Sequence, residues 1–490
     1  MSGDGAHGVI EALAANALNT RFEDLGQATV DHAKNRIIDV LGCAIGGANA
    51  VGNAALLELV RDWGGKEEAS ILVWGGRVPA CNAAMVNSIM ARSLDFEPVN
   101  AMVHGVSVPA HISGTTVMTA TTLGEMKRST GKEVITAMLV GDDIAARVLG
   151  ASGYGLTLGW DCTGTVNMIG ATAIAGRLLG LSERQMVNAL GIAMNQLAGS
   201  FQIIWDATTA FKLPQGLSAR NGVFSAQLAK AGWTGPRDPL LGKFGYYDLY
   251  TGGCTDQNIL TDSLGEEYCA DSTFKPYPCC RGGHAVIDCA LSLLARADVK
   301  ADDIDEIVLY VPKRDIGAFI GQPFTIGDFP HGSAAFNFRY LVACAIVRGG
   351  VKPEHFSEES IRDPKISSVA ERITLAELED EQRLSARLAL TTKSGATLVE
   401  AVDVPTGDPR VKPLTRGDVV DKFRANVEFS GTVARDDSER ALDLLEQLEE
   451  LDNVDKIIEL LTVQWLAPVS NASSESCLLG GGDTGARAAV

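Results

Sequence analysis

An aspartate and a histidine lie on a short polar segment between two apolar stretches. The segment runs Ser93-Leu-Asp-Phe-Glu-Pro-Val-Asn-Ala-Met-Val-His-Gly-Val-Ser-Val-Pro-Ala110. The pattern predicts an apolar helix before it, a loop from Asp95 to His104, and another apolar helix that begins near Val108. A carboxylate and an imidazole on a loop between buried helices can pass a proton or hold one partner in a fixed charge state. The alternative is that both side chains only cap helix ends.

A lysine precedes a turn in the segment Lys212-Leu-Pro-Gln-Gly-Leu-Ser-Ala-Arg220. The Pro and Gly residues predict a turn that leads into a helix. Lys212 would then project into a cleft, where the N-terminus of that helix also attracts an anion. An ordinary turn is the alternative.

The densest group of polar side chains is Phe274-Lys-Pro-Tyr-Pro-Cys-Cys-Arg-Gly-Gly-His284, which carries Lys275, Tyr277, Arg281 and His284. Its two prolines stiffen the backbone and its two glycines permit close backbone contact. Sites often lie between domains, so the segment predicts a binding site at a domain junction. A stiff linker with solvated side chains is the alternative.

Helical periodicity dominates the first 265 residues, and strand patterns begin only after residue 270. The segment 304–311 predicts a strand and 386–402 predicts a β-hairpin. The expected fold is mainly α, with a large all-helical domain and an inserted smaller α+β lid domain. The expected boundaries are 1–269 plus 409–467 for the helical domain, 270–408 for the lid domain, and 468–490 for a disordered Ser/Gly-rich tail.

The charge balance limits the classes of partner. The chain has 61 acidic and 42 basic residues, a formal net charge of −19, which argues against nucleic acid and against anionic membrane surfaces. No signal peptide and no long apolar span is recognised, and the ten scattered cysteines contain no CxxC pair. We therefore expect a cytoplasmic protein with reduced thiols and no metal site. A small anionic substrate stays compatible, because a pocket can be locally basic.

The order and spacing of these segments resemble the MmgE/PrpD family, whose members act on small polycarboxylates as dehydratases, decarboxylases and epimerases. The resemblance covers roughly residues 8 to 465. Further stretches that carry it are Gly159-Trp-Asp-Cys-Thr-Gly-Thr-Val166, Ala219-Arg-Asn-Gly222 and Gly235-Pro-Arg-Asp-Pro-Leu240. The family implies a homodimer, no metal or organic cofactor, and a site in the cleft between the helical and lid domains.

The resemblance also implies roles for single residues. The positions that match the family's catalytic groups are Asp95, His104, Lys212, Lys275, His284 and Tyr340. We expect His104 to be the general base, oriented by Asp95, while His284 or Tyr340 supplies the partner acid.

Three positions depart from the family pattern. Asp161 stands where decarboxylase-like and epimerase-like members have a histidine, Phe96 replaces a second acidic residue, and Cys280 replaces another histidine of some members. Asp161 would repel a carboxylate that an imidazolium attracts, or it could act as a second base. We expect substrate contacts from Asp161, Arg281, Tyr277 and Cys280.

Three functions remain open at this point. The first is a cofactor-independent lyase, a dehydratase or decarboxylase of a small di- or tricarboxylate. The second is an epimerase or isomerase in the same pocket, which a two-base arrangement with Asp161 would favour. The third is a catalytically inactive member that only binds, motivated by Asp161 and Phe96.

Overall fold

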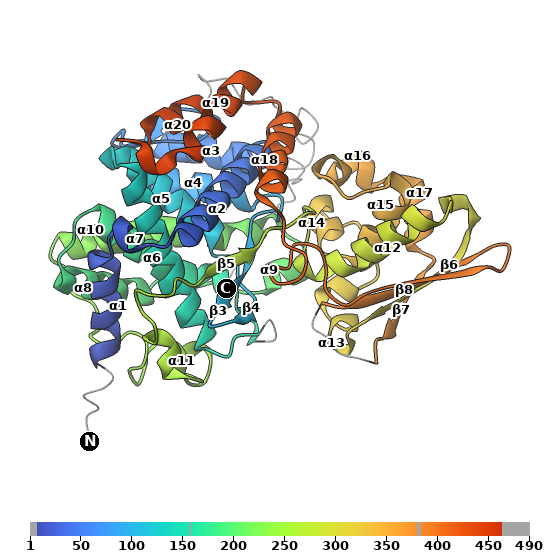
Figure 1. Cartoon of the computed structure of the whole chain (residues 1–490), viewed down its shortest axis with the longest axis horizontal. Helices are drawn as coiled ribbons and strands as arrows, with labels where there is room; N and C mark the ends of the chain where they lie inside the picture. The colour runs from blue at the N-terminus through green and yellow to red at the C-terminus, as the bar shows by residue number, and fades with distance from the viewer. Residues whose placement is uncertain (1–6, 156–157, 380–383, 463–490) are drawn as a thin grey trace, which may run out of the picture.

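The structure, a computed structural model, describes residues 7–155, 158–379 and 384–462. It confirms the mainly α fold: a large helical part fills one side of the molecule and a smaller α+β part lies beside it (Figure 1). The helices of the N-terminal segment are α1 (His7–Asn19), α2 (Gln27–Gly46), α3 (Asn53–Trp63), α4 (Ala80–Arg92), α5 (Ser113–Lys127), α6 (Gly131–Gly150), α7 (Val166–Leu178), α8 (Glu183–Met194), α9 (Gln202–Trp205), α10 (Leu213–Lys230) and α11 (Tyr246–Tyr250).

Glycines let the central helices α6, α7 and α10 approach closely. A Cβ atom on Gly141 of α6 would lie 2.4 Å from a side-chain carbon of Ile174 and 2.8 Å from the carbonyl oxygen of Gly170 on α7. A Cβ atom on Gly222 of α10 would lie 2.6 Å from the Cβ atom of Ala171. Since the three helices are buried on several faces, these contacts set the spacing of the core.

The helical part also contains two small sheets, so the expectation of an all-helical domain is wrong in this detail. One sheet pairs β1 (Ala69–Ser70) with β2 (Arg77–Val78), and the other has the order β4-β3-β5. Its strands are β3 (Val99–Val103), β4 (Val106–Val108) and β5 (Ala270–Thr273). The segment from Asp95 to His104 therefore contains a strand, and the helix expected from Val108 begins only at Ser113. The pairing partner β5 is far away in the sequence, so local patterns did not reveal this strand.

The C-terminal helices return to the helical part (Figure 1). They are α18 (Arg416–Ser430), α19 (Arg435–Glu446) and α20 (Asp455–Leu460). The ammonium of Lys422 on α18 lies 2.8 Å from an Asp39 carboxylate oxygen on α2 and donates a 2.6 Å hydrogen bond to the carbonyl of Phe96. The returning helix therefore fixes the segment that follows α4.

The α+β part is built on a sheet of order β7-β6-β8-β9, in which only β6 and β7 are parallel. The strands are β6 (Ile304–Val311), β7 (Ile373–Glu377), β8 (Ala386–Thr392) and β9 (Thr397–Val402), which confirms the predicted strand and hairpin. The helices are α12 (His284–Arg296), α13 (Lys313–Ile316), α14 (Pro330–Ala335), α15 (Phe338–Arg348), α16 (Glu358–Ile361) and α17 (Pro364–Ala370).

Two residues separate α14, which ends at Ala335, from α15, which begins at Phe338. The side chain of Asn337 accepts hydrogen bonds from the backbone N–H groups of Arg339 and Tyr340 and so caps α15. The predicted tail, 468–490, lies outside the described residues. Among the helices of the described residues, none combines the length and the hydropathy needed to cross a membrane.

The tight contact of α6 with α7 gives a stability prediction. Gly141→Ala should lower the free energy of unfolding by about 1–3 kcal/mol, because the new methyl group forces the two helices apart. Gly417→Ala is the matched control: its Cβ atom would meet only the Thr415 hydroxyl oxygen, at 3.6 Å, so stability should stay the same or rise slightly. Urea denaturation measures both variants, and an equal effect of the two would contradict the packing argument.

Candidate active site

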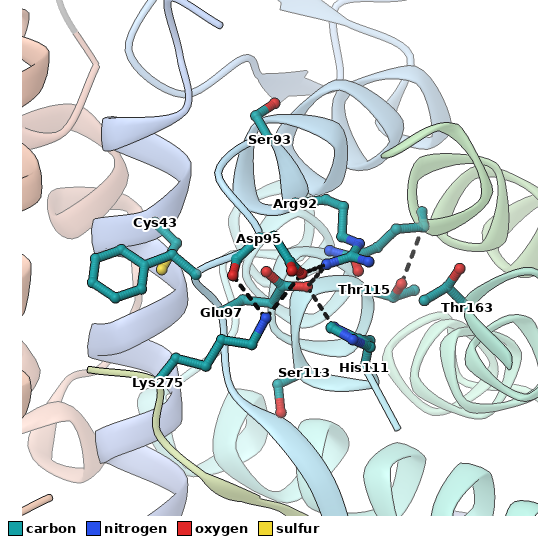
Figure 2. Close-up of polar contacts among 12 residues, drawn as sticks. Cys43, Arg92, Ser93, Asp95, Glu97, His111, Ser113, Thr115, Thr163 and Lys275 are labelled. Atoms are coloured by element: carbon teal, nitrogen blue, oxygen red, sulfur yellow. Dashed lines mark hydrogen bonds and ion pairs between the residues drawn. The ribbon is translucent and has the colours of Figure 1, made fainter. Parts of the chain in front are cut away.

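The centre of the candidate site is a buried aspartate held by two cations. The Nζ atom of Lys275 lies 2.9 Å from Asp95 Oδ1 and donates a 2.7 Å hydrogen bond to the Asp95 carbonyl oxygen. The guanidinium of Arg92 pairs with the same carboxylate (Figure 2). All three side chains are at most 2% exposed. In the structure Asp95 and Lys275, which are 180 positions apart in the sequence, therefore meet.

A second carboxylate connects this centre to a histidine. Nη1 of Arg92 lies 3.0 Å from Oε1 of Glu97, and the same Glu97 oxygen lies 3.0 Å from Nδ1 of His111 (Figure 2). Since a carboxylate only accepts hydrogen bonds, Nδ1 of His111 carries the proton. This leaves the Nε2 lone pair of His111 available to accept a proton from another molecule.

The surrounding elements fix these side chains in place. Arg92 is the last residue of α4, and Asp95 follows it in a left-handed backbone conformation with φ of 49°. Lys275 follows strand β5, which pairs with β3. His111 precedes α5, and its carbonyl accepts a 2.7 Å hydrogen bond from the Asn167 side chain of α7.

The N-terminus of α5 is capped by a residue that lies far away in the sequence. The Asp271 carboxylate of β5 accepts 2.7 Å hydrogen bonds from the backbone N–H groups of Ile112 and Ser113. Burial raises the pKa of Asp271 to about 7, although the hydrogen bonds from Ser113 oppose it. Asp271 therefore orients the segment that carries His111 and couples it to the strand before Lys275.

The charged groups set one another's protonation states. Burial alone would raise the pKa of Asp95, but the positive charges of Lys275 and Arg92 outweigh it and hold this pKa well below its usual range. For Glu97, burial again opposes ionisation, and the charge of Arg92 wins and lowers the pKa. Burial, followed by the charge of Arg92, lowers the pKa of His111. At neutral pH the site thus holds two carboxylates, two cations and a neutral imidazole.

Lys212 lies in a separate polar pocket next to this centre. Its ammonium donates hydrogen bonds to the carbonyl of Val51 at 2.6 Å and to the side chain of Asn53 at 2.7 Å, and it lies 3.4 Å from the Ser93 hydroxyl. Burial lowers the pKa of Lys212 to about 7, and no carboxylate among the described residues pairs with its ammonium. Lys212 is therefore poised to gain a proton when an anion arrives.

Two of the departures from the family pattern lie near the charged centre. The Asp161 carboxylate accepts a 3.0 Å hydrogen bond from the backbone N–H of Thr163, and its charge stabilises the Arg92 guanidinium. Its other oxygen is buried and finds no hydrogen-bond partner among the described residues. Burial raises the pKa of Cys280 to about 12, and the charges of Asp95 and Lys275 also act on this thiol. Cys280 is thus a neutral thiol at the edge of the site.

The other residues of the junction segment are occupied by partners in the α+β part. The Arg281 guanidinium contacts Nδ1 of His284 at 3.0 Å and donates to the Thr406 carbonyl at 2.6 Å. The Tyr277 hydroxyl donates a 2.7 Å hydrogen bond to Asp288. Burial, then the charges of Arg281 and Lys275, lower the pKa of His284 far below its usual value. The rings of Tyr277 and His284 also contact each other, with a centroid distance of 5.2 Å.

The structure does not bring His104 and Tyr340 to the Asp95 centre. His104 lies between β3 and β4, where its Nε2 atom is 3.5 Å from Nη1 of Arg147. The hydroxyl of Tyr340 donates to the carbonyl of His355, and its ring packs against Phe324 and Phe356 in the core of the α+β part. The strand that replaces the expected loop carries His104 away from Asp95.

Three side chains of the centre also have the chemistry of metal ligands. Asp95, Glu97 and His111 offer ligand atoms that all lie within 4.8 Å of one another. However, Arg92 and Lys275 already balance the two carboxylate charges, so a divalent ion would add uncompensated positive charge beside them. The arrangement therefore suits proton transfer better than a metal centre.

A cavity of about 740 Å³ adjoins the chain segments that carry the centre. It lies between α18 and the residues that follow α15. Phe96, the residue between Asp95 and Glu97, and Pro276, the residue after Lys275, contribute to its wall. The cavity thus lies next to the segments of the centre, although Asp95, His111 and Lys275 do not line it.

Sequence reasoning missed four residues of the site: Arg92, Glu97, His111 and Asp271. Arg92 and Glu97 are close neighbours of Asp95 in the sequence, but an arginine at a helix end has an ordinary surface explanation. A signal for His111 was its place in Pro109-Ala-His-Ile-Ser113, directly before an apolar helix. Nothing local identifies Asp271, since its role depends on the pairing of β5 with β3.

Comparison with known proteins is consistent with this architecture. The chain matches the MmgE/PrpD N-terminal domain over residues 11–257 and the MmgE/PrpD C-terminal domain over residues 277–450. The chain belongs to the MmgE/PrpD family, which confirms the resemblance described above.

Among characterised relatives, the chain is 25% identical to the cis-aconitate decarboxylase of Homo sapiens, over 85% of this chain and 87% of the relative. It is 23% identical to the cis-aconitate decarboxylase of Aspergillus terreus, over 94% and 97%. It is 24% identical to the 2-methylcitrate dehydratase of Cupriavidus necator, over 83% and 88%.

The buried charge network predicts a large effect of losing Arg92. Arg92→Met should destabilise the fold by about 3–5 kcal/mol, because it leaves Glu97 without its buried cation and Asp95 with only one. Arg362→Met is the control, since Arg362 and its partner Glu358 are 53% and 67% exposed and should change stability by less than about 1 kcal/mol. Chemical denaturation of both variants tests this, and similar losses would mean that the network does not stabilise the fold.

Proposed function

We propose that the protein is a lyase, a dehydratase or decarboxylase, that acts on a small di- or tricarboxylate without a cofactor. The observation that carries this proposal is the neutral His111. Its Nδ1 proton is held by Glu97, which belongs to a buried network of two carboxylates and two cations. The names of the relatives, cis-aconitate decarboxylase and 2-methylcitrate dehydratase, support the substrate class. Both reactions change a bond next to a carboxylate-bearing carbon.

His111 is the proposed general base, in place of His104. The Glu97 carboxylate fixes the tautomer, so in a dehydration Nε2 receives the proton from the substrate carbon, and Glu97 stabilises the resulting imidazolium. Arg92 in turn pairs with both Glu97 and Asp95 and so holds the segment that carries them. The transfer of the proton to His111 therefore needs no change in the position of these side chains.

The substrate carboxylates are proposed to bind near Lys212 and Lys275. Lys212 has no acidic partner in the part of the chain that the structure describes, and its amine becomes more basic when an anion enters. Lys275 is already paired with Asp95, so it orients one end of the substrate while Asp95 limits the net positive charge.

An epimerase is the second candidate, and one observation favours it. The second carboxylate oxygen of Asp161 is buried and has no hydrogen-bond partner within the described parts of the chain. A carboxylate near Arg92 and a neutral His111 would form two bases, which is what proton removal and return on opposite faces requires. Solvent deuterium that enters the substrate without loss of water or CO₂ would favour this candidate.

The proposal that His111, and not His104, is the general base can be tested directly. His111→Gln should lower kcat on the substrate found in a polycarboxylate panel by about 100-fold or more, since it removes the general base. His104→Gln, at the β3–β4 turn, should keep most of the activity. Steady-state rates measure both, with circular dichroism as the fold control. Full activity of His111→Gln together with loss in His104→Gln would reverse the assignment.

The depressed pKa of Lys212 predicts proton uptake on ligand binding. With a pKa of about 7, Lys212 is mostly neutral at pH 8, and a bound tricarboxylate should raise this pKa and draw a proton from solvent. At pH 6 the lysine is already protonated and its contribution to the uptake should shrink.

Calorimetric titration with tricarballylate in two buffers of different ionisation enthalpy counts these protons. Lys212→Met should remove about one proton from the uptake at pH 8. Lys365→Met, which changes an exposed lysine, should leave the uptake unchanged. Identical uptake in the wild type and Lys212→Met would contradict the role of Lys212.

A further inference from the structure

His331 of the α+β part is a half-buried histidine outside the set of groups discussed so far. It lies in the first turn of α14, and its ring packs against Phe329 and Phe356 with centroid distances of 5.6 Å and 5.3 Å. Its Nε2 atom is buried and has no hydrogen-bond partner among the described residues. Most buried polar atoms in proteins have a partner, so this imidazole nitrogen is available to form a hydrogen bond with a ligand.

The two aromatic residues that flank α14 bring this helix to Lys212. The rings of Phe329 and Phe336 both pack on Phe211, at centroid distances of 6.0 Å and 5.6 Å. Phe211 immediately precedes Lys212, and the guanidinium of Arg92 lies 5.3 Å from the centre of its ring. One aromatic cluster thus connects α14 to Lys212 and to Arg92 of the helical part.

The other end of α14 contacts the junction segment. The backbone N–H of Cys280 donates a 3.1 Å hydrogen bond to the carbonyl of Ala335, the last residue of α14. A Cβ atom on Gly332 would lie 3.2 Å from the carbonyl of Ala207, in the segment before Lys212. The helix that carries His331 is therefore held between the Lys212 segment and the Lys275 segment.

Electrostatics agrees with this placement. Burial, and next the charge of Lys212, lower the pKa of His331 to about 4, while the charge of Asp95 opposes this effect. Lys212 and Asp95 are thus the charged groups that act on the ring, and His331 is neutral in the free protein near pH 7. A bound polycarboxylate would add negative charge and favour the imidazolium form.

We propose that His331 is a catalytic residue that donates a proton to the substrate from the α+β side, opposite His111. The inference rests on the proposed lyase function and adds the acid to it. In a dehydration, the C–H bond breaks and its proton goes to Nε2 of His111. The C–H electron pair forms the C=C bond as the C–O bond breaks, and the hydroxyl leaves as water with the proton of His331.

The same acid serves a decarboxylation. There the C–C bond breaks, CO₂ leaves, and the electron pair that stays on carbon is captured by the proton of His331. In both cases the proton enters His331 from solvent when the anionic substrate binds, and the acid acts only in the transition state. Its loss should therefore affect kcat much more than KM.

The test replaces the ring nitrogens and keeps the packing. His331→Phe preserves an aromatic ring between Phe329 and Phe356, and its kcat should fall by about 100-fold or more with little change in KM. Phe356→Leu is the matched control, because it disturbs the same contact but keeps the imidazole, and it should retain most of the wild-type kcat. A kcat of His331→Phe close to that of the wild type would overturn the proposal.

Two further measurements separate chemistry from structure. His331→Ala leaves a space of the shape of the ring, so added imidazole should restore part of its kcat and should not affect His331→Phe. Tricarballylate should still raise the Tm of His331→Phe, because the acid is not needed for binding. If imidazole restores nothing and tricarballylate no longer raises the Tm, His331 only supports the structure and the proposal is wrong.

Failure of this inference differs from failure of the proposed function. A wild-type protein that neither dehydrates nor decarboxylates any member of a di- and tricarboxylate panel would contradict the lyase function itself. A wild-type enzyme that is active and loses activity in His111→Gln, but not in His331→Phe, would contradict only the role of His331.

Discussion

The structure depends on the mutual compensation of charges that have left water. Arg92, Asp95, Glu97 and Lys275 are almost completely buried, and each cation contacts at least one carboxylate. Removing charges from water costs several kcal/mol per ion, so the cluster persists only while every partner is in place. This requirement ties the end of α4, the strand β5 and the start of α5 to one arrangement, although these elements come from distant parts of the sequence.

The parts that surround the cluster contribute different properties. The helical part supplies a rigid frame, because small residues such as Gly141 allow close helix contacts and Lys422 of the returning α18 fixes the Phe96 carbonyl. The α+β part supplies aromatic rings and the imidazole that packs against them. Burial lowers the pKa of the Lys212 amine and of the His331 imidazole, which favours their neutral forms. Such under-protonated groups are suited to meet an anion, since its charge then stabilises the proton that each group gains.

The sequence predicted much of the fold and half of the centre. The strand 304–311 and the hairpin 386–402 followed from strong local patterns, as did the helices of the large part. Asp95 and Lys275 were expected in one site and do meet. His104 does not lie beside them, because its nearness to Asp95 in the sequence is not nearness in space. The residues after Asp95 form a strand, β3, whose pairing partner β5 lies about 170 positions later, and this strand carries His104 away while the chain returns with His111.

The amino-acid sequence by itself determined which chemistry was available: cationic and imidazole groups concentrated in a few short segments of an acidic chain, in the order typical of the MmgE/PrpD family. Only the tertiary structure decided which of these groups share an environment. Long-range strand pairing accompanies the contact of His111 with Glu97. The aromatic cluster around Phe211 brings His331 towards Lys212. The physical reason is that protonation state depends on burial and on neighbouring charges, and both are properties of the folded chain that no local pattern contains.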